Sequence, residues 1–185
     1  MKYDIPPLLH RTTSPWGDLL LAATPKGLCG VWFDNQKHFP ELKAWPTGRN
    51  AYIDQAQAQL GDYFAGQRRV FDVPLDLSAG TAFQQSVWRA ILTIPMGQVV
   101  SYGSIAHSLN NPAAVRAVGA ATGRNPVGII VPCHRVVGAT GALTGYAGGL
   151  ERKVALLKLE CANTIPPSTL SPSIKTPQPL QASLI

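Results

Sequence analysis

Residues 125–149 read NPVGIIVPCHRVVGATGALTGYAGG, and the architecture of the second half of the chain follows from this stretch. The apolar run VGIIV is typical of a buried strand, and the glycine-rich run behind it predicts a loop. Between the two, Cys133 stands beside His134 and Arg135 in a segment without a carboxylate. A thiolate is the reactive form of cysteine, and nearby positive charge or a base favours it. We therefore predict a strand that leads into a loop with a nucleophilic cysteine.

The composition indicates a globular protein inside the cell. The chain has 185 residues, 45% of them hydrophobic and 14% charged, enough for one core or two small cores that share an interface. No apolar run reaches the length of about 18 residues that a membrane helix needs. The first residues also lack the apolar core and the cleavage site of a signal peptide. We expect a cytoplasmic protein, or a nuclear one if the source is a eukaryote, without membrane association.

The three cysteines stand at wide spacing, which is not the pattern of a disulfide framework. The sequence has neither a CxxC pair nor an HxxxH pair, so we expect no metal site. Cys29 lies in an apolar run and is expected to be a small buried hydrophobe, whereas Cys161 is expected at the surface. Cys133 is therefore the cysteine to which chemistry is assigned.

Positive charge is concentrated in the second half of the chain. Residues 1–80 carry eight basic and eight acidic side chains, whereas residues 81–160 carry seven basic and two acidic ones. No Asp or Glu occurs between Leu77 and Leu150. An abundance of buried and small residues accounts for part of this shortage. A surface that excludes negative charge is nevertheless typical of proteins that bind a polyanion, most often nucleic acid.

The first half has the pattern of a small α+β unit. Two apolar stretches, 17–23 and 27–33, flank the turn sequence TPKG and predict a β-hairpin. Apolar residues with helical spacing predict a helix over 51–66, and residues 70–77 read as an extended connection. No residue here has the marks of a catalytic group. We interpret residues 1–78 as a scaffold domain.

The second half is predicted to be mostly helical. A capping-box spacing at Thr81 and Gln84 starts a helix that stops at Pro95. Two short helices, at about 102–109 and 113–122, are separated by Asn-Pro and form a helix-turn-helix pattern. The second of them has unusually small side chains around one charge, Arg116. These small side chains permit close approach to another surface, or close packing within the protein.

A last helix is predicted over 150–160, with Leu150, Val154, Leu157 and Cys161 on one stripe. The remaining residues, 161–185, are rich in proline and lack periodicity, as expected for a disordered or surface-hugging tail. The predicted fold class is α+β: a small N-terminal domain with a hairpin sheet, then a mostly helical domain, 79–160, that holds the helix-turn-helix and the cysteine loop.

The spacing of His134 allows it to act as a base for Cys133. Adjacent residues in an extended chain point to opposite sides, so a bridging water is the more plausible route for the proton. His134 then needs an acceptor that orients it. Glu151 and Glu160 are the carboxylates of this half. Glu160 is the better candidate, because Glu151 lies beside two basic residues in a solvated-looking stretch.

The stretches IPMGQVVSYGSIA, RAVGAATGRNPVGIIVPCHRV and GALTGYAGGLERKVALLKLE resemble the O6-alkylguanine-DNA alkyltransferases, also called methylated-DNA–protein-cysteine methyltransferases. The resemblance is strong over residues 81–160 and loose over 12–80. It implies direct reversal of DNA damage: an alkyl group passes from O6-alkylguanine, and from O4-alkylthymine, to Cys133, once per protein molecule. No cofactor is implied, and the partner is alkylated double-stranded DNA bound through its minor groove by a monomer.

The same resemblance implies roles for individual residues. Cys133 is the nucleophile, His134 its base through a water, Glu160 the partner of His134, and Tyr102 the proton donor to the departing guanine. Arg116 is the finger that enters the duplex when the nucleotide is flipped. The implied DNA contacts are Arg116, Ala117, Arg124, Arg135, Tyr102 and Ser101. The implied base pocket comprises Val136, Tyr146, Ala147 and Asn125.

Three other functions fit parts of the sequence. An alkyltransferase-like protein binds the lesion without transfer, but it lacks the reactive cysteine. A cysteine hydrolase needs an oxyanion hole, and its Cys and His are usually well separated in sequence. A transcription factor built on the helix-turn-helix would leave PCHRV unexplained. A change in protein mass after exposure to alkylated DNA separates lesion binding from alkyl transfer, and sequence-specific DNA binding is the signature of a transcription factor.

Overall fold

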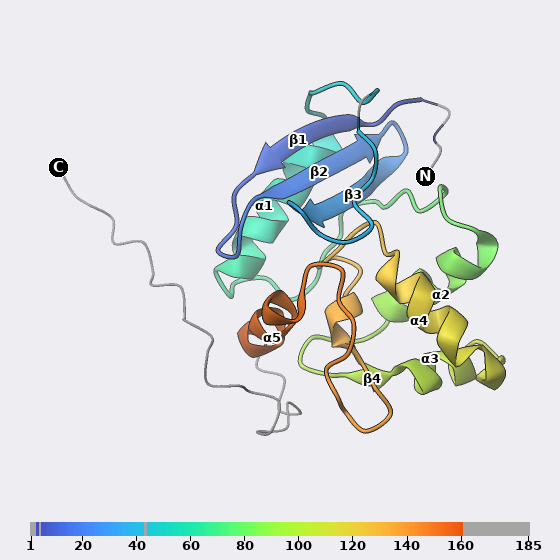
Figure 1. Cartoon of the computed structure of the whole chain (residues 1–185). Helices are drawn as coiled ribbons and strands as arrows, with labels where there is room; N and C mark the ends of the chain where they lie inside the picture. Colours follow the sequence, from blue (N-terminus) through green and yellow to red (C-terminus); the bar gives the residue numbers. More distant parts are fainter. Residues whose placement is uncertain (1–2, 4, 43, 161–185) are drawn as a thin grey trace.

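The computed structural model describes residues 3, 5–42 and 44–160, so the predictions for Cys161 and for the tail 161–185 lie outside the described residues. The first half contains a three-stranded antiparallel sheet of order β1-β2-β3 (Figure 1). Its strands are β1 (Leu8–Thr12), β2 (Leu19–Thr24) and β3 (Gly27–Phe33). The predicted hairpin is β2 and β3, joined at the turn TPKG, and is confirmed.

Both faces of this sheet are covered. Helix α1 (Ala51–Phe64) lies across one face and buries Ile53, Ala56 and Leu60 in the main core (Figure 1). A second apolar cluster around Trp32 covers the other face, with contributions from Phe39 and Trp45. Burial on both faces explains why β2 and β3 read as continuous apolar runs rather than as alternating ones.

The predicted helices of the second half are confirmed. They are α2 (Ala82–Leu92), α3 (Tyr102–Ser108) and α4 (Val115–Gly123), with a 3₁₀ turn (Pro112–Ala114) before α4. The capping box of Thr81 and Gln84 is present at the start of α2, as the spacing indicated. Trp88 of α2 packs behind α4, where its indole N–H donates to the Ala121 carbonyl at 2.9 Å.

The predicted strand at residues 127–131 is wrong. The segment is a tight buried turn, closed by hydrogen bonds from Val131 N to Val127 O and from Ile130 N to Gly128 O. Only Val127 pairs with a strand, through an isolated bridge to Val31 of β3. A Cβ on Gly128 would lie 3.0 Å from the Val31 carbonyl, so the close approach favours glycine. The apolar run reports burial, which a turn inside the core shares with a strand.

The cysteine lies where two short elements meet. A 3₁₀ turn (Cys133–Arg135) leads into β5 (Val136–Val137), which pairs in parallel with β4 (Val100–Ser101). Helix α5 (Leu150–Leu159) closes the described chain and confirms the last predicted helix. Its Leu150 is exposed, against the prediction, because the buried face is formed by Lys153, Val154, Leu156 and Leu157.

The α+β class is confirmed, and the two halves are in direct contact. The backbone N–H of Val31 in β3 donates to the Pro126 carbonyl at 2.9 Å, and Gly128 N donates back to Val31 O at 2.9 Å. The edge of the N-terminal sheet is thus paired with the turn that precedes Cys133. The division at residues 78 and 79 stays a prediction. Within the described ranges, no helix is both long and apolar enough to cross a bilayer.

Replacement of Trp88 tests how the helices are held together. Trp88→Ala removes a side chain that is 1% exposed, together with its bond to α4. We expect it to lower the free energy of unfolding by about 3–5 kcal/mol, since a large cavity remains. Urea unfolding followed by circular dichroism measures the change. Leu92→Ala on the same helix, at a side chain that is 39% exposed, is the control and should change it much less. Equal losses in both variants would contradict this packing.

Candidate active site

Cys133 is buried, with 6% of its surface exposed, and Asn125 holds it in place. The Asn125 amide donates to the Val131 carbonyl at 2.8 Å and to the Cys133 sulfur at 3.1 Å. Its carbonyl oxygen accepts from Val127 N at 3.0 Å. One side chain therefore fixes both the turn and the thiol. The resemblance implies a place for Asn125 in the base pocket, and its contact with the sulfur is an addition to that prediction.

The environment of the thiol favours its neutral form. Burial raises the pKa of Cys133, while the Asn125 hydrogen bond and the charge of Lys153 oppose the rise without cancelling it. The neighbouring cations in the sequence, His134 and Arg135, predict a stabilised thiolate instead. Desolvation outweighs them here, because His134 and Arg135 direct their polar groups to Glu160. A resting thiol of this kind needs a base at the moment of reaction.

His134 can serve as that base. Its Nε2 lies 2.8 Å from Oε1 of Glu160, and both side chains are buried. Although burial opposes ionisation, hydrogen bonds from His134 and Arg135 lower the pKa of Glu160 to about 2, so the carboxylate is ionised at neutral pH. An ionised carboxylate only accepts, so Nε2 carries the proton. Burial lowers the pKa of His134. The ring is therefore neutral, and its Nδ1, which has no hydrogen-bond partner among the described residues, is a free acceptor.

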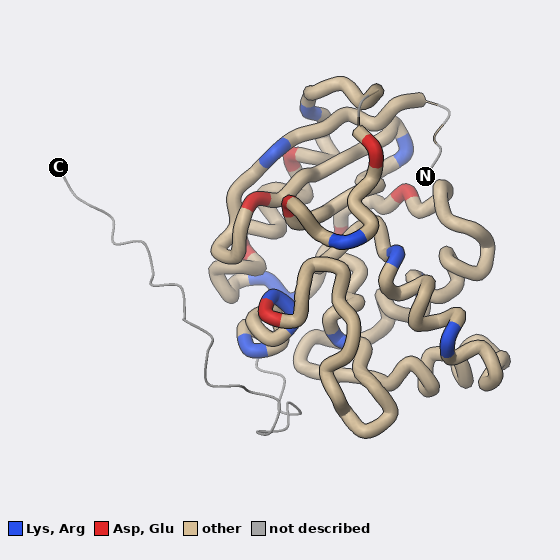
Figure 2. The backbone as a smooth tube through the Cα atoms, in the orientation of Figure 1, with Lys and Arg blue, Asp and Glu red and all other residues tan. Residues whose placement is uncertain are grey.

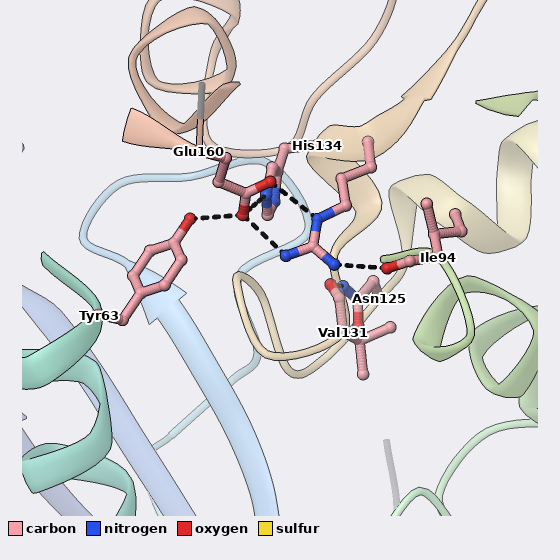
Figure 3. Close-up of polar contacts among 7 residues, drawn as sticks. Tyr63, Ile94, Asn125, Val131, His134 and Glu160 are labelled. Atoms are coloured by element: carbon pink, nitrogen blue, oxygen red, sulfur yellow. Dashed lines mark hydrogen bonds and ion pairs between the residues drawn. The ribbon is translucent and has the colours of Figure 1, made fainter. Parts of the chain in front are cut away.

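Arg135 and Tyr63 complete the contacts of Glu160 (Figure 3). Nε of Arg135 donates to Oε2, and Nη2 donates to Oε1, both at 2.8 Å, while Nη1 donates to the Ile94 carbonyl at 2.5 Å. The Tyr63 hydroxyl donates to Oε1 at 2.7 Å. The predicted DNA contact of Arg135 is corrected by this geometry, because its guanidinium is buried against Glu160. Tyr63 was missed, since nothing in its sequence context marks it.

Lys153 is a second residue of the site that has no predicted role in the sequence. It is fully buried, and its ammonium donates to the Val136 carbonyl at 2.6 Å and to the Thr144 carbonyl at 2.8 Å. Burial lowers its pKa to about 8. Lys153 and Leu157 are four residues apart on α5, so they share the buried face. This spacing could have predicted the burial of Lys153, but a charged residue is ordinarily expected at the surface.

The remaining predicted pocket residues lie around this centre. Tyr102, at the start of α3, donates from its hydroxyl to the Thr144 carbonyl at 3.3 Å, and burial raises its pKa. Ser101 caps the same helix. The Tyr146 ring is nearly perpendicular to that of His134, with centroids 6.5 Å apart. The Ala147 carbonyl accepts from Lys37 N of the first half. The loop 138–149 is thus in contact with α3 through Tyr102 and with the first half of the chain through Lys37.

The predicted DNA-facing residues of α4 are exposed. Arg116 and Ala117 lie on the outer side of the helix, and Arg124 follows its end. Figure 2 shows basic positions on the helices of this half and no acidic one among α2, α3 and α4.

Among the residues that the structure describes, no group of three or more His, Cys, Asp or Glu side chains could hold a metal ion. Burial raises the pKa of Cys29 to about 12.

These features define a class of protein: a helix-turn-helix protein with a buried thiol, a neutral histidine and an ionised carboxylate behind it. Two models of one family match the chain. The ribonuclease-like domain of 6-O-methylguanine DNA methyltransferase matches residues 9–77, and the DNA-binding domain matches residues 82–162. The chain therefore belongs to the 6-O-methylguanine DNA methyltransferase family.

Similar proteins come from bacteria and archaea. Methylated-DNA–protein-cysteine methyltransferases of Mycobacterium tuberculosis (50% identical over 155 residues, 83% of this chain and 93% of theirs) and Methanosarcina acetivorans (50% over 147 residues, 80% and 94%) are among them. The crystal structure of the M. tuberculosis protein OGT in complex with DNA matches with a TM-score of 0.77 at 47% identity, covering 84% of this chain and 94% of that one.

The Glu160 contacts predict an acid-sensitive contribution to stability. The carboxyl pKa falls from an ordinary 4.5 to about 2 on folding. The ionised group therefore stabilises the fold above about pH 5, on the order of 3 kcal/mol, and the contribution is lost as pH falls towards 2. Glu160→Gln should be less stable than wild type at neutral pH, with the gap narrowing between about pH 5 and pH 2 in urea unfolding. Glu151→Gln, at an exposed position of α5, is the control. Stability curves of Glu160→Gln and wild type that stay parallel across this range would contradict the assignment.

Proposed function

We propose that this protein repairs DNA by direct reversal, moving an alkyl group from O6 of guanine to the sulfur of Cys133. The observation that carries the proposal is the thiol held by Asn125 next to a neutral His134 whose Nε2–H is tied to Glu160. The relatives named above are called methylated-DNA–protein-cysteine methyltransferases. The reaction is expected wherever the cell keeps its DNA, in the cytoplasm or in the nucleus of a eukaryote.

In the reaction, the thiol proton passes to Nδ1 of His134 through a water molecule, and the charge of Glu160 stabilises the imidazolium. The sulfur attacks the alkyl carbon in line, a carbon–sulfur bond forms, and the carbon–oxygen bond to guanine breaks. Tyr102 donates a proton to the departing base, and the proton held by His134 returns to Tyr102 through solvent, so both side chains end neutral. The thioether is stable, so each molecule acts once. The side chains present supply the base and the proton donor without a cofactor, and O4-alkylthymine offers the same kind of leaving group.

The helix-turn-helix presents the lesion to the thiol. A base inside the duplex stack is out of reach of Cys133, so the nucleotide must be flipped, at an energetic cost of a few kcal/mol. We assign to the exposed Arg116 the role of filling the vacated space in the duplex. The small side chains of α4 suit the minor groove, and one protein monomer on double-stranded DNA suffices. Ser101, Ala117 and Arg124 flank this surface as further DNA contacts.

The pocket for the flipped base is formed by the backbone of Cys133 and Val136 and by the loop at Tyr146 and Ala147. Lys153 uses one acceptor position of the Val136 carbonyl. A carbonyl oxygen has two, so the second is available to an amino group of the base. Asn125 positions the wall of the pocket through its contacts with Val131 and the sulfur.

Removal of the thiol tests the function directly. In wild-type protein incubated with duplex DNA that contains O6-methylguanine, a methyl group should replace the thiol hydrogen, so the mass should rise by one CH2 group, and peptide mapping should place the methyl group on Cys133. Cys133→Ala should gain none and still bind the DNA, since the binding surface lies on α4. Transfer to Cys29 or Cys161 in Cys133→Ala would overturn the assignment. Binding without any mass change in the wild type would instead favour a lesion-binding protein.

Arg116 separates base flipping from chemistry. Arg116→Ala should slow the repair of duplex DNA by tenfold or more. The reason is that the arginine side chain offsets part of the unstacking energy of the flipped nucleotide, which is about a few kcal/mol. It should leave the reaction with the free base O6-benzylguanine nearly unchanged, because that base needs no flipping. Single-turnover rates on both substrates make the comparison, with Arg89→Ala as a control from another exposed helical position. Equal losses on both substrates would assign Arg116 to the fold.

A further inference from the structure

Tyr63 brings the first half of the chain to the proton relay. It lies on α1, in the part that matches the ribonuclease-like domain, 97 positions before Glu160. Its side chain is fully buried, and its hydroxyl donates to Oε1 of Glu160 at 2.7 Å (Figure 3). This is the same oxygen that accepts from Nε2 of His134 at 2.8 Å.

The oxygen Oε1 is crowded with donors. Tyr63, His134 and Nη2 of Arg135 all donate to it within 2.8 Å, whereas Oε2 accepts from Nε of Arg135. A carboxylate oxygen offers about two lone pairs as hydrogen-bond acceptors. The three donors therefore compete for the lone pairs of Oε1. Charge that is drawn towards Tyr63 is less available to an imidazolium at His134.

We propose that Tyr63 is a positioning residue of the alkyl-transfer relay: its hydroxyl fixes Oε1 of Glu160 and limits how strongly that oxygen holds a proton on His134. The proposal rests on the proposed function, in which His134 must be neutral before it takes the proton of Cys133. Without the hydroxyl, Oε1 interacts more strongly with a protonated ring. His134 then stays protonated to a higher pH than in wild type, and over that added interval it is lost as a base.

The ionisable side chains around the relay come from every element packed against it. They are Tyr63 on α1, Cys133, His134 and Arg135 on the 3₁₀ turn, Tyr146 in the loop, and Lys153 and Glu160 on α5 and its cap. Tyr63→Phe leaves all the others in place. Its effect on His134 can therefore be assigned to the loss of one hydrogen bond.

The test is the pH profile of the reaction with free O6-benzylguanine, which does not depend on base flipping. In wild type, the rate falls on the acid side as His134 is protonated. In Tyr63→Phe, this acid limb should move up by about half a unit to one pH unit, so the rate below both midpoints drops about three- to tenfold while the alkaline plateau is kept. Tyr52→Phe, on the same helix, should match wild type. Glu160→Gln should move the limb the opposite way and lower the plateau, because the charge itself is gone.

A second measurement separates failure of this proposal from failure of the proposed function. Titration of the ¹⁵N-labelled imidazole of His134 by NMR needs no alkyl transfer and should show the same upward shift in Tyr63→Phe. Absence of transfer by wild type would overturn the function and leave this titration to decide on Tyr63. An unshifted or downward-shifted His134, with only a lower melting temperature, would show that Tyr63 merely supports the fold and would overturn the proposal.

A fluorinated residue covers the case in which Tyr63→Phe does not fold. Burial raises the pKa of Tyr63 far above its ordinary value, and the charge of Glu160 adds to the rise, so a more acidic phenol stays protonated there. Tyr63→3-fluorotyrosine keeps the shape of the side chain and strengthens the donor. The acid limb and the His134 titration should then move to lower pH. No shift, or a shift to higher pH, would refute the competition at Oε1.

Discussion

The buried carboxylate of Glu160 is the constraint on which the rest of the site depends. A charge with 4% exposure is tolerated only when its lone pairs are filled, because removal from water costs several kcal/mol per ion. The donors come from α1 through Tyr63 and from the cysteine turn through His134 and Arg135. Arg135 in turn holds the Ile94 carbonyl behind α2. One charge therefore binds both halves, in addition to the backbone hydrogen bonds between Val31 and residues 126–128.

The same burial also determines the resting protonation states of Cys133 and His134. Desolvation raises the pKa of Cys133 and lowers that of His134, so both are neutral at rest. A neutral thiol inside the protein is a poor nucleophile towards solutes that merely pass by. The ionised Glu160 becomes effective when His134 takes up charge. In the proposed reaction, the thiol loses its proton to His134 when an alkyl carbon lies in line with the sulfur.

The sequence predicts what depends on local pattern, and it misses most of what depends on contacts between distant segments. The contact of His134 with Glu160 is the exception, because residues 81–160 contain two carboxylates to choose from and the family resemblance favours the same one. The capping box of Thr81 and the hairpin turn are local, and they were predicted correctly. The run 127–131 is apolar, and it was therefore predicted to be a strand. The prediction is wrong because apolar residues indicate burial and do not specify the shape of the backbone. Arg135 read as a DNA contact, since its partner Glu160 lies 25 positions away and no pattern pairs them. The contact of Tyr63 with Glu160, 97 positions apart, is beyond any pattern in the chain.

The outer surface and the buried site are joined by a short covalent path. Helix α4 ends at Gly123, and Asn125, two residues later, already donates to the sulfur of Cys133 at 3.1 Å. The helix itself is held from behind by Trp88 at the Ala121 carbonyl. Its exposed face can therefore contact DNA without loosening the turn that carries the thiol. The small exposed side chains and the rigid buried end of α4 are the two features that the DNA contact proposed for this helix requires.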